Sequence, residues 1–327
     1  MSVCPAFPDR PLRLGTRGSP LARAQAGLVA RALAAAHPAL AAPGAIDLVA
    51  IRTTGDREQN RSLAAIGGKG LFTKEIEEAL LAGDIDLAVH SMKDLPTWLP
   101  DGLVIGCVLP REDPRDVLIA RDAAPRLSAL PRGAVLGTSS LRRQAQVLAL
   151  RPDLRVVPLR GNVDTRLAKL SAGVVDATLL ALAGLRRLDR AAGTGAVVST
   201  EEILPAVAQG AIGVERRADD GAMRDLLAPI DDAASAACVA AERACLAALE
   251  GSCRTPIAAL AERLDPDAPA GRGRLRLRAL VALPDGSVVH RDERVGPEAA
   301  PEALGHAAGE ALQKRAGPAF FNTLALG

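Results

Sequence analysis

The chain has 327 residues, a length that predicts two or three domains with substantial hydrophobic cores. Aromatic residues make up only 2% of it, so stacking platforms for single-stranded nucleic acid are not expected, and a net charge of +2 also argues against a nucleic-acid partner. No apolar run reaches the length of a membrane span, and the N-terminus lacks the apolar region of a signal peptide. We therefore expect a cytoplasmic protein without membrane contact.

The cysteines and histidines indicate no metal site. The five cysteines are odd in number and form no C-x-x-C pair, which is typical of reduced thiols, and the four histidines lie far apart in sequence. Cys253 differs from the other cysteines because it lies in the turn EGSCRTP and not on an apolar helix face. An incidental thiol is the alternative interpretation of this residue.

The first predicted strand, Leu12–Thr16, leads into a turn that carries Arg17. Ser19 can cap the helix that follows, and Pro20 can take its first position. A second strand, Ile46–Ile51, precedes a long polar loop. A cation in the turn between a strand and a helix is a pattern that recurs further along the chain.

A glycine-rich segment, Gly67–Gly70, precedes a helix whose apolar side includes Phe72. Its glycines and Lys69 suggest a phosphate-binding loop. The segment fails the Walker pattern, however, which needs GxxxxGK followed by Ser or Thr. Phosphate transfer is therefore not expected.

An apolar strand over residues 86–90 delivers the polar segment Ser91–Asp94 at its C-terminal end. Ligands of open α/β sheets collect at such strand ends, so Lys93 and Asp94 are candidate site residues. A surface pair of charges without function is the alternative interpretation.

Positive charge concentrates in residues 137–166, where six arginines face two aspartates. Gly137 ends an apolar run, the hydroxyl residues Thr138–Ser140 can cap a helix, and Arg142 and Arg143 stand in its first turn. Cations are disfavoured at the start of a helix unless an anion lies nearby. The pattern therefore predicts an anion at this turn.

The same arrangement repeats directly afterwards. A strand over residues 155–159 leads into the turn Arg160–Asn162, and the following helix carries Arg166. The planar guanidinium pairs bidentately with carboxylate or phosphate, so two neighbouring anion-binding turns are predicted. A solvated helix face with nothing bound is the alternative.

From Asp231 the composition changes to that of a small α+β unit. An Ala-rich helix over residues 233–249 precedes three predicted strands and a final helix over residues 301–316. Pro284–Gly286 is a hairpin signal between the last two strands. The strands are expected at residues 257–262, 274–283 and 288–295, with a Pro/Gly-rich surface insert at residues 265–273.

Eight consecutive motifs resemble one family, porphobilinogen deaminase, also called hydroxymethylbilane synthase. They appear in family order over about nine tenths of the chain. They are TRGSPLA (Thr16–Ala22), GGKGLFTKEIEEALL (Gly67–Leu81), HSMKDLP (His90–Pro96), REDPRD (Arg111–Asp116), GTSSLRRQ, RGNVDTRL, PAVAQGAIGVE and AERACLAALEGSCRTPIA, which ends at Ala258.

The resemblance implies an α/β fold of two periplasmic-binding-protein-like (type II) domains and a small C-terminal α+β domain with a three-stranded antiparallel sheet. Domain 1 would comprise residues 1–109 and 205–230, domain 2 residues 110–204, and domain 3 residues 231–327. A monomer is expected.

The resemblance also implies a transferase that joins four porphobilinogen molecules head to tail on a dipyrromethane cofactor and releases hydroxymethylbilane, with loss of ammonia. The cofactor would be attached covalently through Cys253, and Asp94 would be the catalytic carboxylate. Lys69 and Phe72 would form a lid or support. The residues that match the family's carboxylate-binding positions are Arg17, Ser19, Lys93, Ser139, Arg142, Arg143, Arg160, Arg166 and Arg187.

The chain departs from the family pattern beside the attachment cysteine, where Ser252 replaces the usual Gly and Arg254 replaces a neutral residue. Two other functions fit parts of the sequence. A non-catalytic polycarboxylate-binding module of the same architecture predicts no covalent adduct and no turnover. A nucleic-acid-binding protein predicts steeply salt-dependent binding.

Overall fold

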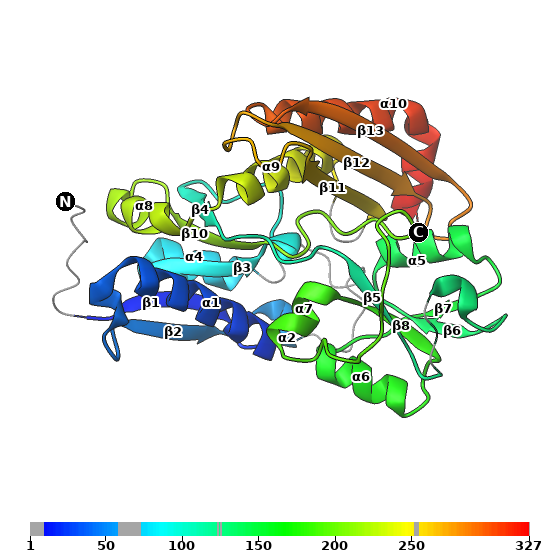
Figure 1. Ribbon diagram of the computed structural model, residues 1–327, viewed down its shortest axis with the longest axis horizontal. Helices are drawn as coiled ribbons and strands as arrows, with labels where there is room; N and C mark the ends of the chain where they lie inside the picture. Colours follow the sequence, from blue (N-terminus) through cyan, green and yellow to red (C-terminus); the bar gives the residue numbers. More distant parts are fainter. Residues whose placement is uncertain (1–9, 58–72, 123, 125, 252–254, 327) are drawn as a thin grey trace. The chain divides into compact units, whose positions relative to one another are not determined.

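The computed structural model describes residues 10–57, 73–122, 124, 126–251 and 255–326. Within these ranges the chain forms two compact units, Met1–Arg111 with Ala211–Ala236, and Glu112–Gly210 with Ala237–Gly327. The first unit contains one mixed sheet, and the second contains another mixed sheet and a three-stranded antiparallel sheet (Figure 1). This confirms the expected combination of two α/β sheets with one smaller antiparallel sheet.

The sheet of the first unit has the order β2-β1-β3-β10-β4. Strand β1 runs parallel to β2 and β3, whereas β10 lies antiparallel between β3 and β4. The strands are β1 (Leu12–Arg17), β2 (Ile46–Ile51), β3 (Leu87–Ser91), β4 (Leu103–Val108) and β10 (Ile212–Arg217). The first unit is therefore completed by chain that returns after residue 210.

Helices cover both faces of this sheet. Helices α1 (Pro20–Ala36) and α8 (Gly221–Leu227) contribute to one buried cluster with Leu12 and Leu14. Helix α4 (Lys74–Ala82) contributes to a second cluster with Ile85 and Leu103. The short helix α2 (Thr54–Arg57) follows β2.

The mixed sheet of the second unit has the order β7-β6-β8-β5-β9. Strand β6 runs parallel to β7 and β8, and β5 is antiparallel to β8 and β9. The strands are β5 (Asp116–Ala120), β6 (Val135–Gly137), β7 (Arg155–Val157), β8 (Ala177–Ala181) and β9 (Ala196–Val197), and the helices are α5 (Leu141–Leu150), α6 (Val163–Ser171) and α7 (Leu182–Arg187). The two mixed sheets thus share one pattern of strand directions, although the inner antiparallel strand comes last in the chain in the first sheet and first in the second.

Polar side chains cap three helices, α1 and α5 at hydroxyl residues predicted as caps, and α6 at Asn162, which the sequence places only in a turn. Ser19 Oγ accepts a hydrogen bond from the Ala22 amide at 3.2 Å, and Asn162 Oδ1 accepts one from Thr165 at 2.9 Å. Ser140 caps α5 by accepting from the Arg143 amide at 3.4 Å. These bonds satisfy amides that have no partner inside the helix, and they place Arg142 and Arg143 in the first turn of α5.

The antiparallel sheet has the order β11-β12-β13 and is preceded by helix α9. Helix α10 lies along this sheet and contacts β12 and β13 (Figure 1). The bounds are α9 (Ala233–Ala248), β11 (Ile257–Arg263), β12 (Arg274–Ala282), β13 (Val289–Pro297) and α10 (Pro301–Leu326). Gly317, with a φ of 72°, interrupts α10 just after the residue at which the sequence predicts the helix to end.

Helix α5 packs on both sides within the second unit. Val147 belongs to the core of the mixed sheet, whereas Ala145 packs with Leu204 and residues of β11 and β12. The hairpin turn before β13 also contacts α5, because Gln144 Nε2 donates to the Pro284 carbonyl at 3.1 Å. The arginine-bearing helix is thus fixed by two sheets. The division into three domains at residues 109, 204 and 230 stays a prediction.

Candidate active site

The turn that carries Asp94 is anchored from within the first unit. Strand β3 pairs with β10, and the Met92 amide donates to the Ala211 carbonyl at 3.1 Å. Met92 and Leu95 are buried, with 1% and 5% of their surface exposed, whereas Asp94 between them is exposed. Lys93 is half-buried. The buried neighbours hold the turn while its carboxylate faces solvent.

A buried hydrogen-bonded pair involves His90 of the same strand. His90 Nε2 is 3.0 Å from Glu215 Oε2 of β10, and both side chains are almost fully buried. Burial also raises the pKa of Glu77 on α4. No local sequence signal indicates this pair, because only the antiparallel register of β3 and β10 brings His90 and Glu215 together.

Arg17 and Ser19 lie where β1 passes into α1. Arg17 is the last residue of β1 and is half-buried, and Ser19 is the N-cap of α1. The capping bond uses Ser19 Oγ as an acceptor, which leaves its hydroxyl hydrogen able to donate to a ligand. Both predicted residues therefore lie at a strand end of the first unit.

Arg142 and Arg143 in the second unit converge on one carboxylate, that of Asp116 at the start of β5. Arg142 Nη2 donates to Asp116 Oδ2 at 2.9 Å, and Arg143 donates through Nε at 3.0 Å and Nη2 at 2.7 Å. The side chains of Arg142, Arg143 and Asp116 are 5%, 6% and 0% exposed, respectively. The anion predicted at this helix start thus includes a residue of the chain itself.

The electrostatics of this Asp116 cluster, defined as Asp116, Arg142 and Arg143, leave a surplus positive charge. Burial by itself raises the pKa of Asp116, but the charges of Arg143 and Arg142 and the hydrogen bonds outweigh it and hold that pKa well below its ordinary value. Two guanidinium groups and one carboxylate then sum to +1. Among the described residues, the buried Arg142 Nε and Ser139 Oγ have no hydrogen-bond partner.

Residues 204–210, here called the crossover segment, precede β10 in the chain and contact the Asp116 cluster. The Leu204 carbonyl accepts a hydrogen bond from Arg142 Nη1 at 2.7 Å, and Gln209 Nε2 donates to Asp116 Oδ1 at 2.8 Å. The Gly210 carbonyl accepts from Arg187 Nη2 at 2.6 Å. Burial lowers the pKa of Arg187, while Glu112 acts in the opposite direction.

Arg160 lies in the second predicted turn, and Arg166 lies in the helix α6 that follows it. Arg166 Nε donates to the Gly161 carbonyl at 2.8 Å, and Lys169 Nζ donates to the Arg160 carbonyl at 3.0 Å. Both arginines are half-buried. In contrast, Arg151 at the C-terminal end of α5 pairs with Asp153 at 2.7 Å and donates to the Leu127 carbonyl. Its charge is therefore neutralised by a residue of the chain.

Several predicted residues lie outside the described residues. They are the attachment cysteine Cys253 with its neighbours Ser252 and Arg254, and the lid candidates Lys69 and Phe72. Within the described residues, no group of three or more His, Cys, Asp or Glu side chains could hold a metal ion. None of the helices in the described ranges is long and apolar enough to cross a membrane.

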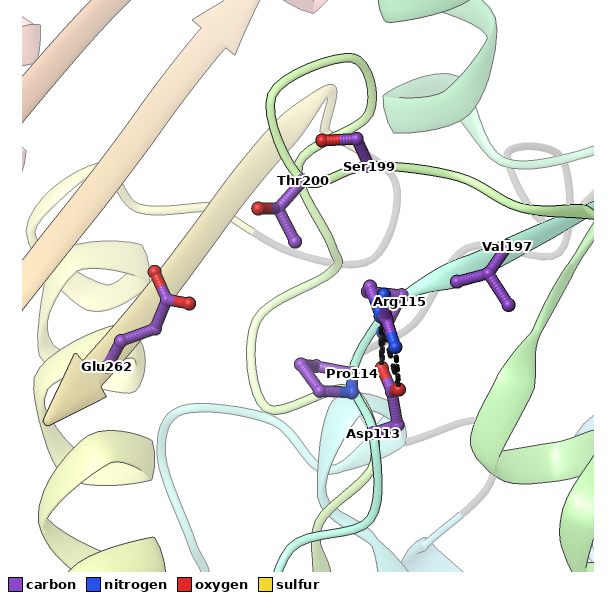
Figure 2. Close-up of a pocket in the computed structure, with 7 residues that line it drawn as sticks. All are labelled: Asp113, Pro114, Arg115, Val197, Ser199, Thr200 and Glu262. Atoms are coloured by element: carbon purple, nitrogen blue, oxygen red, sulfur yellow. Dashed lines mark hydrogen bonds and ion pairs between the residues drawn. The ribbon is translucent and has the colours of Figure 1, made fainter. Parts of the chain in front are cut away.

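A polar cavity of about 550 Å³ opens in the second unit (Figure 2). Its walls come from the segment before β5, the loop after β9 and the end of β11, and Arg115 pairs with Asp113 at 2.6 Å on one side. The lining residues are Asp113, Pro114, Arg115, Val197, Ser199, Thr200 and Glu262. None of the predicted site residues lines it.

Comparison with known proteins identifies the family. A family model described as the porphobilinogen deaminase dipyrromethane cofactor binding domain matches residues 12–225, and the model of the porphobilinogen deaminase C-terminal domain matches residues 236–314. The chain belongs to the porphobilinogen deaminase family. Its activity is that of porphobilinogen deaminase in tetrapyrrole biosynthesis, as the sequence motifs predict.

Individual relatives agree with the family models. Porphobilinogen deaminase of Paracoccus denitrificans is 57% identical over 96% of this chain and 97% of that protein. The chloroplastic porphobilinogen deaminase of Oryza sativa subsp. japonica is 52% identical over 96% of this chain and 86% of that protein. A solved periplasmic aliphatic sulphonate binding protein of Escherichia coli is 17% identical, covers 74% of this chain and 71% of its own, and has a TM-score of 0.39.

The described residues fit the dipyrromethane cofactor that the family uses. Each pyrrole of such a group carries carboxylate side chains, and guanidinium groups are the side chains best suited to bind them. The Asp116 cluster has a surplus charge of +1 and an unpartnered buried donor at Arg142 Nε within the described part of the chain. A bound carboxylate would satisfy both.

Proposed function

We propose that this chain joins four porphobilinogen molecules head to tail on a dipyrromethane primer attached to Cys253, with loss of four ammonia molecules, and that hydrolysis by one water molecule releases hydroxymethylbilane. The observation that carries the proposal is the Asp116 cluster, in which two buried arginines share one carboxylate. Burying uncompensated positive charge is costly, so such a cluster favours an anionic ligand. Porphobilinogen, a pyrrole with acetate and propionate groups, supplies one.

Asp94 is the proposed catalytic carboxylate. Its turn is held by the buried Met92 and Leu95, while the carboxylate itself is exposed. An ionised carboxylate in a fixed position can accept hydrogen bonds from pyrrole N–H groups and stabilise positive charge that develops during the reaction. Lys93, next to it, can bind a substrate carboxylate.

Carboxylate recognition is the proposed role of the remaining arginines and hydroxyls. Every added pyrrole unit brings two carboxylates, so a growing chain needs several guanidinium groups. In the second unit Arg160 lies in the turn before α6, Arg166 lies in α6 and bonds to that turn, and Arg187 donates to the Gly210 carbonyl. Arg17 and Ser19 in the first unit and Ser139 in the second complete the proposed set.

Cys253 is the proposed attachment point of the cofactor. When bound, the dipyrromethane supplies the pyrrole carbon to which incoming units are joined. The other cysteines are poorly suited to this attachment where the structure describes them, because Cys107, Cys238 and Cys245 are buried. Burial raises the pKa of the thiols of Cys107 and Cys245 to about 12. The thiolate is the reactive form, so these residues stay inert.

Further proposals concern the lid, the domains and the surroundings of the protein. Lys69 and Phe72 are proposed to cover or support the site. The domain boundaries at residues 109, 204 and 230, the monomeric state and the absence of a nucleic-acid partner also belong to the proposal. The free thiols of Cys107, Cys238 and Cys245 support a cytoplasmic location, because the cytosol keeps thiols reduced.

The stoichiometry of turnover tests the proposed reaction. Purified protein is incubated with porphobilinogen, and ammonia and tetrapyrrole are both measured. The proposal predicts about four ammonia molecules per tetrapyrrole, because each joined unit loses one aminomethyl nitrogen. Binding of porphobilinogen without release of ammonia would instead identify a polycarboxylate-binding module and would reject the proposed function.

A further inference from the structure

The carboxylate of Asp116 is saturated with hydrogen bonds. Its two oxygens accept from Arg142 Nη2, from Arg143 Nε and Nη2, and from Gln209 Nε2, at 2.7 to 3.0 Å. A carboxylate offers about four acceptor positions, so Asp116 has none left for a ligand. Its role is therefore internal to the protein.

This saturation fixes the orientation of both guanidinium groups. Arg143 uses the edge that holds Nε and Nη2 for a bidentate contact with Asp116. Arg142 is held at two points, by Asp116 and by the Leu204 carbonyl. Side chains held in this way lose little conformational freedom when a ligand binds, which raises affinity.

The crossover segment shares in this arrangement. Gln146 of α5 clamps the backbone of Leu204, because its Nε2 donates to the Leu204 carbonyl at 3.0 Å and its Oε1 accepts from the Leu204 amide at 2.7 Å. The same carbonyl accepts from Arg142, and Gln209 bonds to Asp116. The direction of both arginines thus depends on one carboxylate and on the segment that contacts it.

We propose that Asp116 is a positioning residue for carboxylate recognition, which orients Arg142 and Arg143 and leaves the cluster one negative charge short of neutral. The inference rests on the proposed function. It adds that the cluster is a receptor for a single ligand carboxylate, because a second would reverse its charge. Asp116 itself touches no substrate and acts through the two arginines.

The test compares Asp116→Asn with Asp153→Asn. The second variant is a matched control, because it removes another Arg–Asp pair, that of Arg151 at the opposite end of α5. Cofactor-free protein is produced in cells unable to make porphobilinogen, porphobilinogen is added, and the rise in intact mass is followed over time. Asp116→Asn is expected to load at least tenfold more slowly than wild type, and Asp153→Asn within twofold of it.

A background without both arginines separates positioning from a purely structural role. In Arg142→Gln combined with Arg143→Gln, Asp116 has no guanidinium group left to orient. If Asp116 acts through the arginines, adding Asp116→Asn to this double variant slows loading no further. A further tenfold loss would contradict the inference, because the effects of two independent defects add.

Each remaining outcome also decides the question. Wild-type protein that fails to load rejects the proposed function together with this inference, whereas normal loading of both wild type and Asp116→Asn overturns the inference alone. If Asp116→Asn does not fold, Gln209→Met is the milder probe, because it removes the hydrogen bonds of Gln209 Nε2 to Asp116 and to the Pro114 carbonyl, but no charge. It is expected to slow loading about threefold, and an unchanged rate would overturn the inference.

Discussion

His90 and Glu215 form a buried pair beneath the turn that carries Asp94, with 3.0 Å between His90 Nε2 and Glu215 Oε2. Glu215→Gln replaces a carboxylate oxygen with an amide nitrogen and weakens this buried hydrogen bond, so it should lower the free energy of unfolding by about 1–3 kcal/mol. Urea unfolding at neutral pH measures this. Glu78→Gln, which alters an exposed pair with Lys74, is the control and should change stability by less than about 0.5 kcal/mol.

The hairpin turn at Gly286 is expected to be intolerant of a side chain. Gly286 has a φ of 73°, and a Cβ atom there would overlap the backbone of α5 at Ala145 and Ala149. Gly271 has a similar φ of 78° but open space around it. Gly271→Ala should therefore cost about 1 kcal/mol from backbone strain alone, and Gly286→Ala clearly more.

Thermal unfolding of both variants separates strain from overlap. Because α5 carries Arg142 and Arg143, Gly286→Ala should also slow cofactor loading, whereas Gly271→Ala should not. Equal melting temperatures for the two variants would contradict the close packing of this hairpin on α5.

Much of the second sheet's arginine region could be predicted from sequence, because its signals are local. Hydroxyl residues followed by Arg142 and Arg143 predict a capped helix and a nearby anion, and both are present. The identity of the anion could not be predicted. Asp116 lies 26 residues before Arg142, and only the placement of β5 and α5 in the folded unit joins them.

Two other contacts could not be predicted either, because they also join residues that are far apart in sequence. The sequence predicts a turn at Gly286, yet nothing in it indicates that the turn packs on α5. His90 and Glu215 lie 125 residues apart and meet because β10 inserts between β3 and β4. Local patterns thus predict elements and caps, whereas long-range pairing of charged residues requires the register of the sheet.

Asp94→Asn should keep the fold and the cofactor while turnover collapses. The amide has the shape of the carboxylate but cannot stabilise positive charge, so kcat should fall at least a hundredfold. Asp101→Asn, an exposed aspartate of the same unit, should keep wild-type turnover. Steady-state assays with porphobilinogen and intact masses check both variants, and near-normal activity of Asp94→Asn would remove it from the catalytic role.

Asp86 should contribute to the loss of stability in acid. Burial by itself raises the pKa of Asp86, but hydrogen bonds from Arg10 and Arg13 outweigh it and lower the pKa to about 2. The folded pKa is thus below the ordinary value of 3.8, so the stabilisation is present above about pH 4 and is lost as the pH falls toward 2.

Urea unfolding at pH 5 and pH 3 measures this contribution. Wild type should lose about 1 kcal/mol more between these pH values than Asp86→Asn, which has no carboxyl group to titrate. The exposed Asp84 provides the control, and Asp84→Asn should behave like wild type. An identical pH dependence in Asp86→Asn and wild type would contradict the proposed linkage.

The central claim is that Cys253 carries the dipyrromethane primer, and the intact mass of purified protein tests it most directly. In cells that make porphobilinogen, wild type and Cys245→Ala should exceed the mass of the bare chain by two linked pyrrole units. Cys245 is a suitable control because it is buried and its pKa is raised to about 12. Cys253→Ser should have the mass of the bare chain. A wild-type mass equal to that of the bare chain, or an adduct that persists in Cys253→Ser, would contradict the account.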